Sequence, residues 1–175
     1  MATAEATSYA DEVQDAAEQG RKPSAFVPNL ITEMTKENPT VADAYLTSQG
    51  FHEEGGALPA EQQAVLLAVS SYNDCHYCTK AHAAAGQQAG LDTETTATIN
   101  EGGLPNDDRL RPLVQATRRI LGNRGWLSDV DESEFEDLGL GRPEFYEFIA
   151  LVGIKTMSNY VNHIAETNLD EPFRQ

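Results

Sequence analysis

Residues 71–82, with the sequence SYNDCHYCTKAH, contain both cysteines of the chain, and the expected fold can be built outward from them. The asparagine and aspartate directly before Cys75 are typical helix N-caps, and an alanine-rich run follows. Because an α-helix turns about 100° per residue, Cys78 is expected one turn beyond Cys75, and His82 one turn beyond Cys78. The pattern predicts two thiols and an imidazole in one row at the start of a helix.

This position changes the expected chemistry of the thiols. Unpaired backbone N–H groups and the helix dipole favour negative charge in the first turn of a helix. Thiols of Cys-x-x-Cys pairs at helix starts can have pKa values of about 7 or below, against about 8.5 for a free thiol. His82 lies within reach of the Cys78 proton. The arrangement suits a thiol that reacts with peroxides or exchanges disulfides, beside a second thiol that resolves the product.

Three other interpretations of the cysteine pair remain open. Two helical cysteines can be small hydrophobic residues of a buried core. Together with His82 they could be three ligands of a zinc ion, with a fourth ligand from elsewhere because the chain has no second Cys-x-x-Cys. A structural disulfide between them would close only a very small loop, which constrains the unfolded chain little.

Composition narrows the class of protein. The 175 residues suffice for one domain with a core of its own, or for a protomer that buries more surface by association. The net charge of −16 argues against binding to nucleic acids and to anionic membrane surfaces. The N-terminus lacks the pattern of a signal peptide, and no apolar run is long enough to span a bilayer. We therefore expect a cytoplasmic protein, where Cys-x-x-Cys favours redox or metal chemistry, and we predict no cofactor.

Apolar periodicity predicts an all-α, single-domain helical bundle over residues 1–175, with residues 1–8 as a loose tail. No alternating strand pattern of useful length occurs. Helices are expected over 9–19, from 28, from 39, from 59 to the cysteines, from there to 89, from 92, from 107 or 108 to 121, over 128–135 and over 143–167.

The last predicted helix carries polar residues in an otherwise apolar sequence. Lys155, Asn159 and Asn162 recur at helical spacing, so they form a stripe that could line the cysteine site from the opposite side. The alternative is that Lys155 is solvated and that His163 is hydrogen-bonded near the helix end. The sequence leaves both readings open.

The motif Asn73-x-Cys75-x-Tyr77-Cys78-x-x-x-His82 resembles the carboxymuconolactone decarboxylase superfamily, and within it the alkylhydroperoxidase D-like, peroxidase-related branch. The resemblance extends over most of the chain. Supporting pieces are Pro28-Asn29-Leu30, Arg124-Gly125-Trp126, Asn159-Tyr160-Val161-Asn162-His163 and Asp170.

The resemblance implies an all-helical fold that assembles into homo-oligomers, and a thiol-dependent peroxidase acting in antioxidant defence. It assigns the attack on a small hydroperoxide to Cys78, and the resolution of the sulfenic acid as a disulfide to Cys75. It places His82 in a proton relay. A partner thiol reductant system would then reduce the disulfide.

The sequence departs from this family pattern at two positions. The glutamate that the pattern has on the preceding helix falls on Gln63, which cannot act as a base but could orient His82 or a water molecule. Glu61 could replace it only if the helix start is irregular; otherwise it is a first-turn acid that complements the helix dipole. Tyr77 stands where the hydroperoxidase has a histidine.

Two further functions remain as alternatives to a peroxidase. One is a non-catalytic metal-binding or redox-sensing oligomer. The other is a lyase or isomerase on the same scaffold, with His82 or His163 as acid–base. Decarboxylation is not expected, because the decarboxylase branch works without the cysteine pair.

Overall fold

The computed structural model describes residues 26–53 and 58–174. These residues form helices and no strand, so the all-α prediction is confirmed. The helices are α2 (Asn29–Glu37), α3 (Pro39–Glu53), α4 (Pro59–Tyr72), α5 (His76–Gln88), α6 (Thr93–Asn100), α7 (Leu110–Gly122), α8 (Asp129–Asp137), α9 (Arg142–Ala165) and the 3₁₀ helix η1 (Glu171–Phe173). The tail predicted over 1–8 and the helix predicted over 9–19 lie outside the described residues.

Several helix starts follow the capping signals of the sequence. Asp92 accepts a hydrogen bond from the backbone N–H of Thr95 at 2.6 Å and caps α6. Ser128 and Asp131 form a reciprocal capping box at the start of α8. Asp107 accepts from the backbone N–H of Leu110 at 2.7 Å, at the start of α7. The caps of α6 and α8 are those that the sequence predicts. The N-cap of α7 is Arg109 and not Asp107 or Asp108, because the Asp107 carboxylate lies in the turn before it and accepts from the N–H groups of Arg109 and Leu110.

The start of the cysteine helix differs from the prediction. Its N-cap is Cys75, and neither Asn73 nor Asp74 caps it. Asn73 ends α4, and Asp74 adopts a left-handed conformation with φ +53°. The reason is the tight turn between α4 and α5, in which the Cys75 N–H returns to the carbonyl of Ser70 at 3.0 Å. Cys78 therefore lies in the first turn of α5, with Cys75 directly before it.

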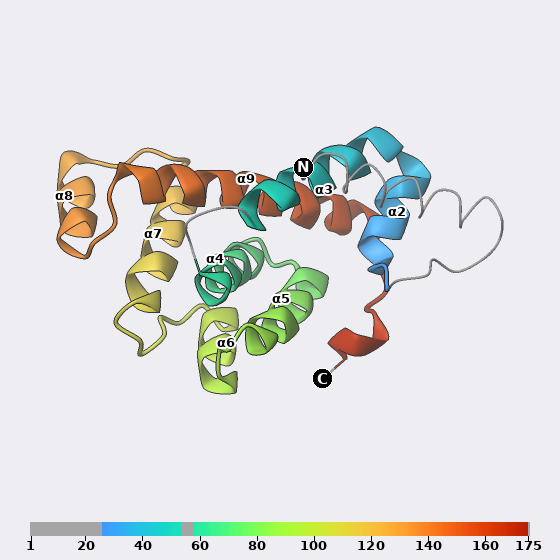
Figure 1. The fold of residues 1–175 in the computed structure, drawn as a ribbon, viewed down its shortest axis with the longest axis horizontal. Helices are drawn as coiled ribbons and strands as arrows, with labels where there is room; N and C mark the ends of the chain where they lie inside the picture. The colour runs from blue at the N-terminus through green and yellow to red at the C-terminus, as the bar shows by residue number, and fades with distance from the viewer. Residues whose placement is uncertain (1–25, 54–57, 175) are drawn as a thin grey trace.

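Helix α4 forms the centre of the bundle and packs against α5, α6, α7 and α9. Figure 1 shows α9 running along the length of the molecule, with α7 and α8 beside its N-terminal half and α2 and α3 beside its C-terminal half. None of the described helices combines the length and the apolar character that crossing a membrane requires.

Two clusters of buried apolar residues hold these helices together. One joins α4, α7 and α8 to the first half of α9, through side chains such as Leu67, Phe135 and Phe148. The other joins α2, α3 and α5, and it includes both cysteines, with residues of the second half of α9 packed against it. The cysteine pair therefore belongs to the packing of the molecule at the end where α2 and α3 meet α5 and α9.

Candidate active site

A cavity of about 350 Å³ opens beside Cys78. It brings together three of the four residues predicted for the site, Cys78, His82 and Gln63. The fourth, Cys75, does not line the cavity, and both cysteines are fully buried. The full lining is Pro28, Leu30, Ile31, Tyr45, Leu46, Gln49, Gln63, Tyr77, Cys78, Ala81, His82, Ala85, Lys155 and Phe173. Cys78 thus borders a cavity with a mainly apolar wall and a few polar groups.

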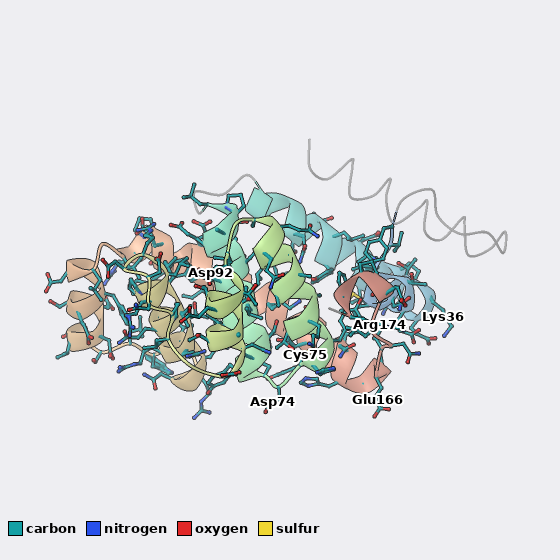
Figure 2. The ribbon with its side chains drawn as sticks, turned by 90° about the horizontal axis from the view of Figure 1, so that it is seen from below. Lys36, Asp74, Cys75, Asp92, Glu166 and Arg174 are labelled. Carbon is teal, nitrogen blue, oxygen red and sulfur yellow. The ribbon has the colours of Figure 1, made fainter. Side chains whose placement is uncertain are left out.

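The two cysteines are free thiols that lie beside each other. Figure 2 labels Cys75 next to Asp74, where α5 begins. The side-chain amide of Asn162 on α9 donates to Cys75 Sγ at 3.5 Å. No group of three or more His, Cys, Asp or Glu side chains in the described ranges is arranged to hold a metal ion.

The surroundings shift the pKa values of the two thiols in opposite directions. The pKa of Cys78 is lowered to about 6. The main cause is the hydrogen bond from Cys75, followed by the charge of Lys155 and by hydrogen bonding from Asn159 and Lys155, and burial acts in the opposite direction. The same hydrogen bond, with burial, raises the pKa of Cys75. The charge of Lys155 lowers the pKa of both thiols, but Cys78 also has hydrogen bonding from Asn159 and Lys155. The surroundings therefore favour the thiolate form of Cys78 over that of Cys75.

His82 is oriented by Gln63. Its Nδ1 lies 2.8 Å from Gln63 Oε1, and because an amide oxygen only accepts hydrogen bonds, Nδ1 carries the proton and Nε2 remains an acceptor. Burial and the positive charge of Lys155 lower the pKa of His82 well below its usual value. The imidazole is therefore neutral at pH 7. Gln63 orients the ring but provides no negative charge that would stabilise an imidazolium.

Glu61 takes no part in this arrangement. Its side chain is buried at the start of α4, where it accepts from the backbone N–H of Leu58 at 3.1 Å and pairs with Arg109 Nε at 2.6 Å. It therefore serves the helix start and the junction with α7, in line with the first-turn alternative.

The polar stripe on α9 faces the cysteines. Lys155 is 2% exposed and lines the cavity, Asn159 is fully buried, and Asn162 contacts Cys75. The alternative in which Lys155 is solvated is wrong, because the apolar faces of α2, α3 and α5 cover it. His163 is exposed and its ring packs against Tyr160, with the centroids 5.8 Å apart.

Sequence reasoning missed the contact that closes the cavity from the C-terminal side. The Tyr77 hydroxyl donates to Asp170 Oδ2 at 2.5 Å, and the Asp170 carboxylate also accepts from the backbone N–H of Asn29, at the start of α2. Phe173 packs edge-on against the Tyr77 ring with the centroids 6.0 Å apart. Burial and the hydrogen bond to Asp170 raise the pKa of Tyr77, which keeps the phenol neutral. The sequence feature that could have drawn attention to this contact is Tyr77, which stands between the cysteines where the hydroperoxidase has a histidine.

No family model matches the chain, and a search of curated proteins finds no match. Solved structures do match. One is an uncharacterized peroxidase-related protein from Silicibacter sp. TM1040, 20% identical, with a TM-score of 0.76 over 93% of this chain and 87% of that one. Another, described as an alkylhydroperoxidase AhpD core, is an uncharacterized peroxidase-related protein from Ralstonia eutropha JMP134, 16% identical, with a TM-score of 0.77 over the same shares.

The debrominase Bmp8 is also similar in structure. Its apo form is 18% identical, with a TM-score of 0.68 over 95% of this chain and 88% of that one. A cysteine-to-alanine variant in complex with 2,3,4-tribromopyrrole is 17% identical, with a TM-score of 0.66 over 85% and 80%. The chain therefore has the alkylhydroperoxidase D-like fold that its motif predicts.

Proposed function

We propose that this protein is a thiol peroxidase that reduces small organic hydroperoxides through Cys78 and Cys75. The observation that carries the proposal is a thiol of lowered pKa at a cavity, with a second free thiol of raised pKa beside it. A peroxidase of this kind needs one sulfur that is a thiolate before the peroxide arrives. It also needs another sulfur that keeps its proton until the first has reacted.

The proposed reaction has two steps that balance. The Cys78 thiolate attacks the terminal oxygen of the hydroperoxide, the O–O bond breaks, and the leaving alkoxide takes up a proton from solvent and departs as an alcohol. Cys78 is then a sulfenic acid. Cys75 attacks its sulfur, the S–S bond forms, and water leaves with the former Cys75 proton. An external dithiol returns both cysteines to thiols, which fits a cytoplasmic location with thiol reductants.

His82 is the group proposed to move protons between these steps. With Nδ1 held by Gln63, the free Nε2 can accept a proton from a thiol and return it to a leaving oxygen. Because Gln63 is neutral, the imidazolium is a transient species and not a resting state. The apolar wall of the cavity, with Tyr45, Tyr77 and Phe173, favours an organic substituent on the peroxide.

A single-turnover titration tests this function. Reduced protein is treated with cumene hydroperoxide, and the alcohol product, free thiols and disulfide are quantified by chromatography and peptide mass spectrometry. We expect one alcohol and one Cys75–Cys78 disulfide for each peroxide consumed. In Cys75→Ser the reaction should stop at a sulfenic acid on Cys78 that dimedone traps. Peroxide that stays intact, or is consumed with both thiols left free, would exclude the proposal.

A second candidate function is reductive dehalogenation. It is favoured by the likeness to the debrominase and by the aromatic side chains that line the cavity beside Cys78. In that reaction the two thiols supply two electrons, a carbon–halogen bond becomes a carbon–hydrogen bond, halide leaves, and the same disulfide forms. Bromide release from 2,3,4-tribromopyrrole by reduced protein, without turnover of hydroperoxide, would favour this function over the peroxidase.

The proposed assembly is a homo-oligomer with the outer face of α9 in its interface. This face presents Tyr146, Ile149, Tyr160 and Ile164, which are 67%, 46%, 56% and 89% exposed. Gly153, between them on the same helix, leaves open space for a close neighbour. Apolar side chains that line one face of a 24-residue helix are typical of a surface that is covered in solution.

Acidic substitutions on this face are expected to dissociate the oligomer. The double substitution Tyr160→Glu with Ile164→Asp places two negative charges where copies would meet, so the molar mass measured by light scattering should fall to that of a smaller species. Val130→Asp on α8 is the matched control, because Val130 is 76% exposed and lies on another helix. An unchanged molar mass in the double variant, or an equal fall in the control, would contradict the proposal that α9 forms part of the interface.

A further inference from the structure

Lys155 is a buried cation without a carboxylate partner. Only 2% of the residue is exposed, and no ion pair in the described part of the chain includes it. Among the described residues, none of those that line the same cavity is an aspartate or a glutamate. Burying an ammonium group without an opposite charge is costly, so such groups are paired or lose their proton. A charged Lys155 therefore requires an anion close to it.

The titratable groups around Lys155 leave one candidate for that anion. Tyr45 on α3 and Tyr77 on α5 line the same cavity; the Tyr45 hydroxyl accepts from Gln49, and the raised pKa of Tyr77 keeps it neutral. His82 can be neutral or positive, but not negative. Cys75 holds its proton because its pKa is raised. Only the Cys78 sulfur remains.

Asn159 supplies a second donor at the same place. It lies one turn beyond Lys155 on α9 and is fully buried. Its Oδ1 accepts from the Asn73 side chain at 3.0 Å, which fixes the amide, and its Nδ2 has no well-aligned acceptor among the described residues. An orphaned buried N–H is rare and costs about 1–3 kcal/mol unless it has a partner. The lowered pKa of Cys78 includes hydrogen bonding from this group.

We propose that Lys155, supported by Asn159, is the resident counter-ion of the Cys78 thiolate, in place of the imidazolium that a cysteine–histidine pair would use. The identification of Cys78 as the attacking sulfur rests on the proposed function; the ion pair itself does not. His82 is then free to remain neutral and to accept protons. This division of roles agrees with Gln63, which cannot balance a charged imidazole.

The ion pair has a consequence for the disulfide. Oxidation converts the Cys78 thiolate into a neutral sulfur, and Lys155 then loses its partner inside the protein. The reduced form is therefore stabilised relative to the oxidised form, and the disulfide is easy for a dithiol partner to reduce. Removing Lys155 should make the disulfide harder to reduce, which shifts its potential to more negative values.

The test measures the alkylation rate of Cys78 against pH, read on its own peptide in the full chain. In the wild type the rate should rise through a midpoint well below that of a free thiol. Lys155→Met is expected to raise the midpoint by about 1–3 pH units, because an adjacent cation lowers a pKa by that amount. From a pKa of about 6 in the wild type, a rise of about one unit should slow alkylation at pH 7 about twofold, and a rise of about two units should slow it about tenfold. Lys155→Arg should retain most of the effect, and His82→Asn should leave the midpoint nearly unchanged.

The outcomes separate this proposal from its rival. An unchanged profile in Lys155→Met would overturn it, and a midpoint raised in His82→Asn alone would show a cysteine–histidine pair instead. The disulfide potential gives a second readout that packing alone would not move. If Lys155→Met lowers the equilibrium constant for reduction of the disulfide tenfold, the disulfide potential becomes more negative by about 30 mV, because the couple transfers two electrons. Neither measurement needs peroxide, so a failure of the peroxidase assay would leave this test intact.

A stability comparison covers the case in which Lys155→Met folds poorly. Cys78→Ser removes the thiolate and leaves the ammonium buried alone, so it should unfold at a lower temperature than the wild type at pH 8. Adding Lys155→Met to Cys78→Ser removes the unpaired charge and should recover part of the loss. A double variant less stable than Cys78→Ser would contradict the ion pair.

Discussion

Replacing Cys78 by serine is expected to abolish hydroperoxide reduction, with a loss of at least about 10³-fold in rate, as is usual when an attacking nucleophile is removed. A serine hydroxyl is not ionised near pH 7, so neither Lys155 nor Asn159 has an anion to stabilise. The rate is measured by peroxide consumption in single-turnover stopped flow, with the wild type as reference.

Substitutions at Cys75 provide the matched control, because they leave the attacking sulfur in place. Cys75→Ser retains an O–H donor toward Cys78, whereas Cys75→Ala removes the hydrogen bond that contributes most to the low pKa of Cys78. The first turnover should therefore survive in Cys75→Ser. In Cys75→Ala it should slow at pH 7, because the pKa of Cys78 rises and less thiolate is present. Steady-state turnover should stop in both.

The sign of the pH dependence follows from the lowered pKa of Cys78. Thiolate is present above pH 6 and is lost as the pH falls through about 6, so the wild-type first turnover should decline over that range. The decline should begin at higher pH in Cys75→Ala. If Cys78→Ser and the wild type consumed peroxide at the same rate, Cys78 would not be the attacking group.

Local signals in the sequence predicted the parts of this site that local chemistry determines. The spacing of Cys78 and His82 put both on one face of α5, and the structure places both at the cavity. The position of Gln63 opposite His82 came from the family pattern and agrees with the contact at 2.8 Å. The roles of these residues remain predictions until they are tested.

Other parts of the site depend on packing between distant segments, which periodicity cannot specify. The spacing of Lys155 and Asn159 shows a polar stripe, but only the covering by α2, α3 and α5 decides that Lys155 is buried. The N-cap at Cys75 depends on the turn that Asp74 makes at positive φ. The contact between Tyr77 and Asp170 joins residues 93 positions apart. The tyrosine in place of the family's histidine marks position 77 as unusual, but no local signal indicates its partner.

Removing the Asp170 carboxylate, which holds the Tyr77 side chain at the wall of the cavity, is expected to cause a large loss of stability. Asp170 is buried and accepts from the Tyr77 hydroxyl and from the backbone N–H at the start of α2. Asp170→Ala would leave the buried Tyr77 O–H without an acceptor, at about 1–3 kcal/mol, although the phenol oxygen would still accept from the backbone N–H of Leu30. It would also leave the N–H at the start of α2 without its acceptor, at about 1 kcal/mol. The sum, about 3 kcal/mol, corresponds to a fall of about 10 °C in Tm for a chain of this size.

Two further variants show whether the hydrogen bond itself carries this effect. Tyr77→Phe removes only the hydroxyl and leaves Asp170 its backbone donor, so it should cost about 1 kcal/mol. Glu171→Ala is the control beside Asp170. Glu171 is exposed and forms an ion pair with Arg174, the residue after η1, so thermal unfolding should not change measurably. In the double variant Asp170→Ala with Tyr77→Phe, the loss should be smaller than the sum of the single losses, because the phenol is no longer orphaned.

The same variants connect stability to the cavity. Phe173 packs on Tyr77 and lines the cavity, so loosening the C-terminal segment should open the site to water. A wetter site weakens the ion pair of Lys155 and Cys78, which should raise the pKa of Cys78 in Asp170→Ala but not in Glu171→Ala. Alkylation of Cys78 at pH 7 would then slow as Tm falls. If Tm fell while the alkylation profile stayed in place, the C-terminal segment would support the fold without shaping the thiolate site.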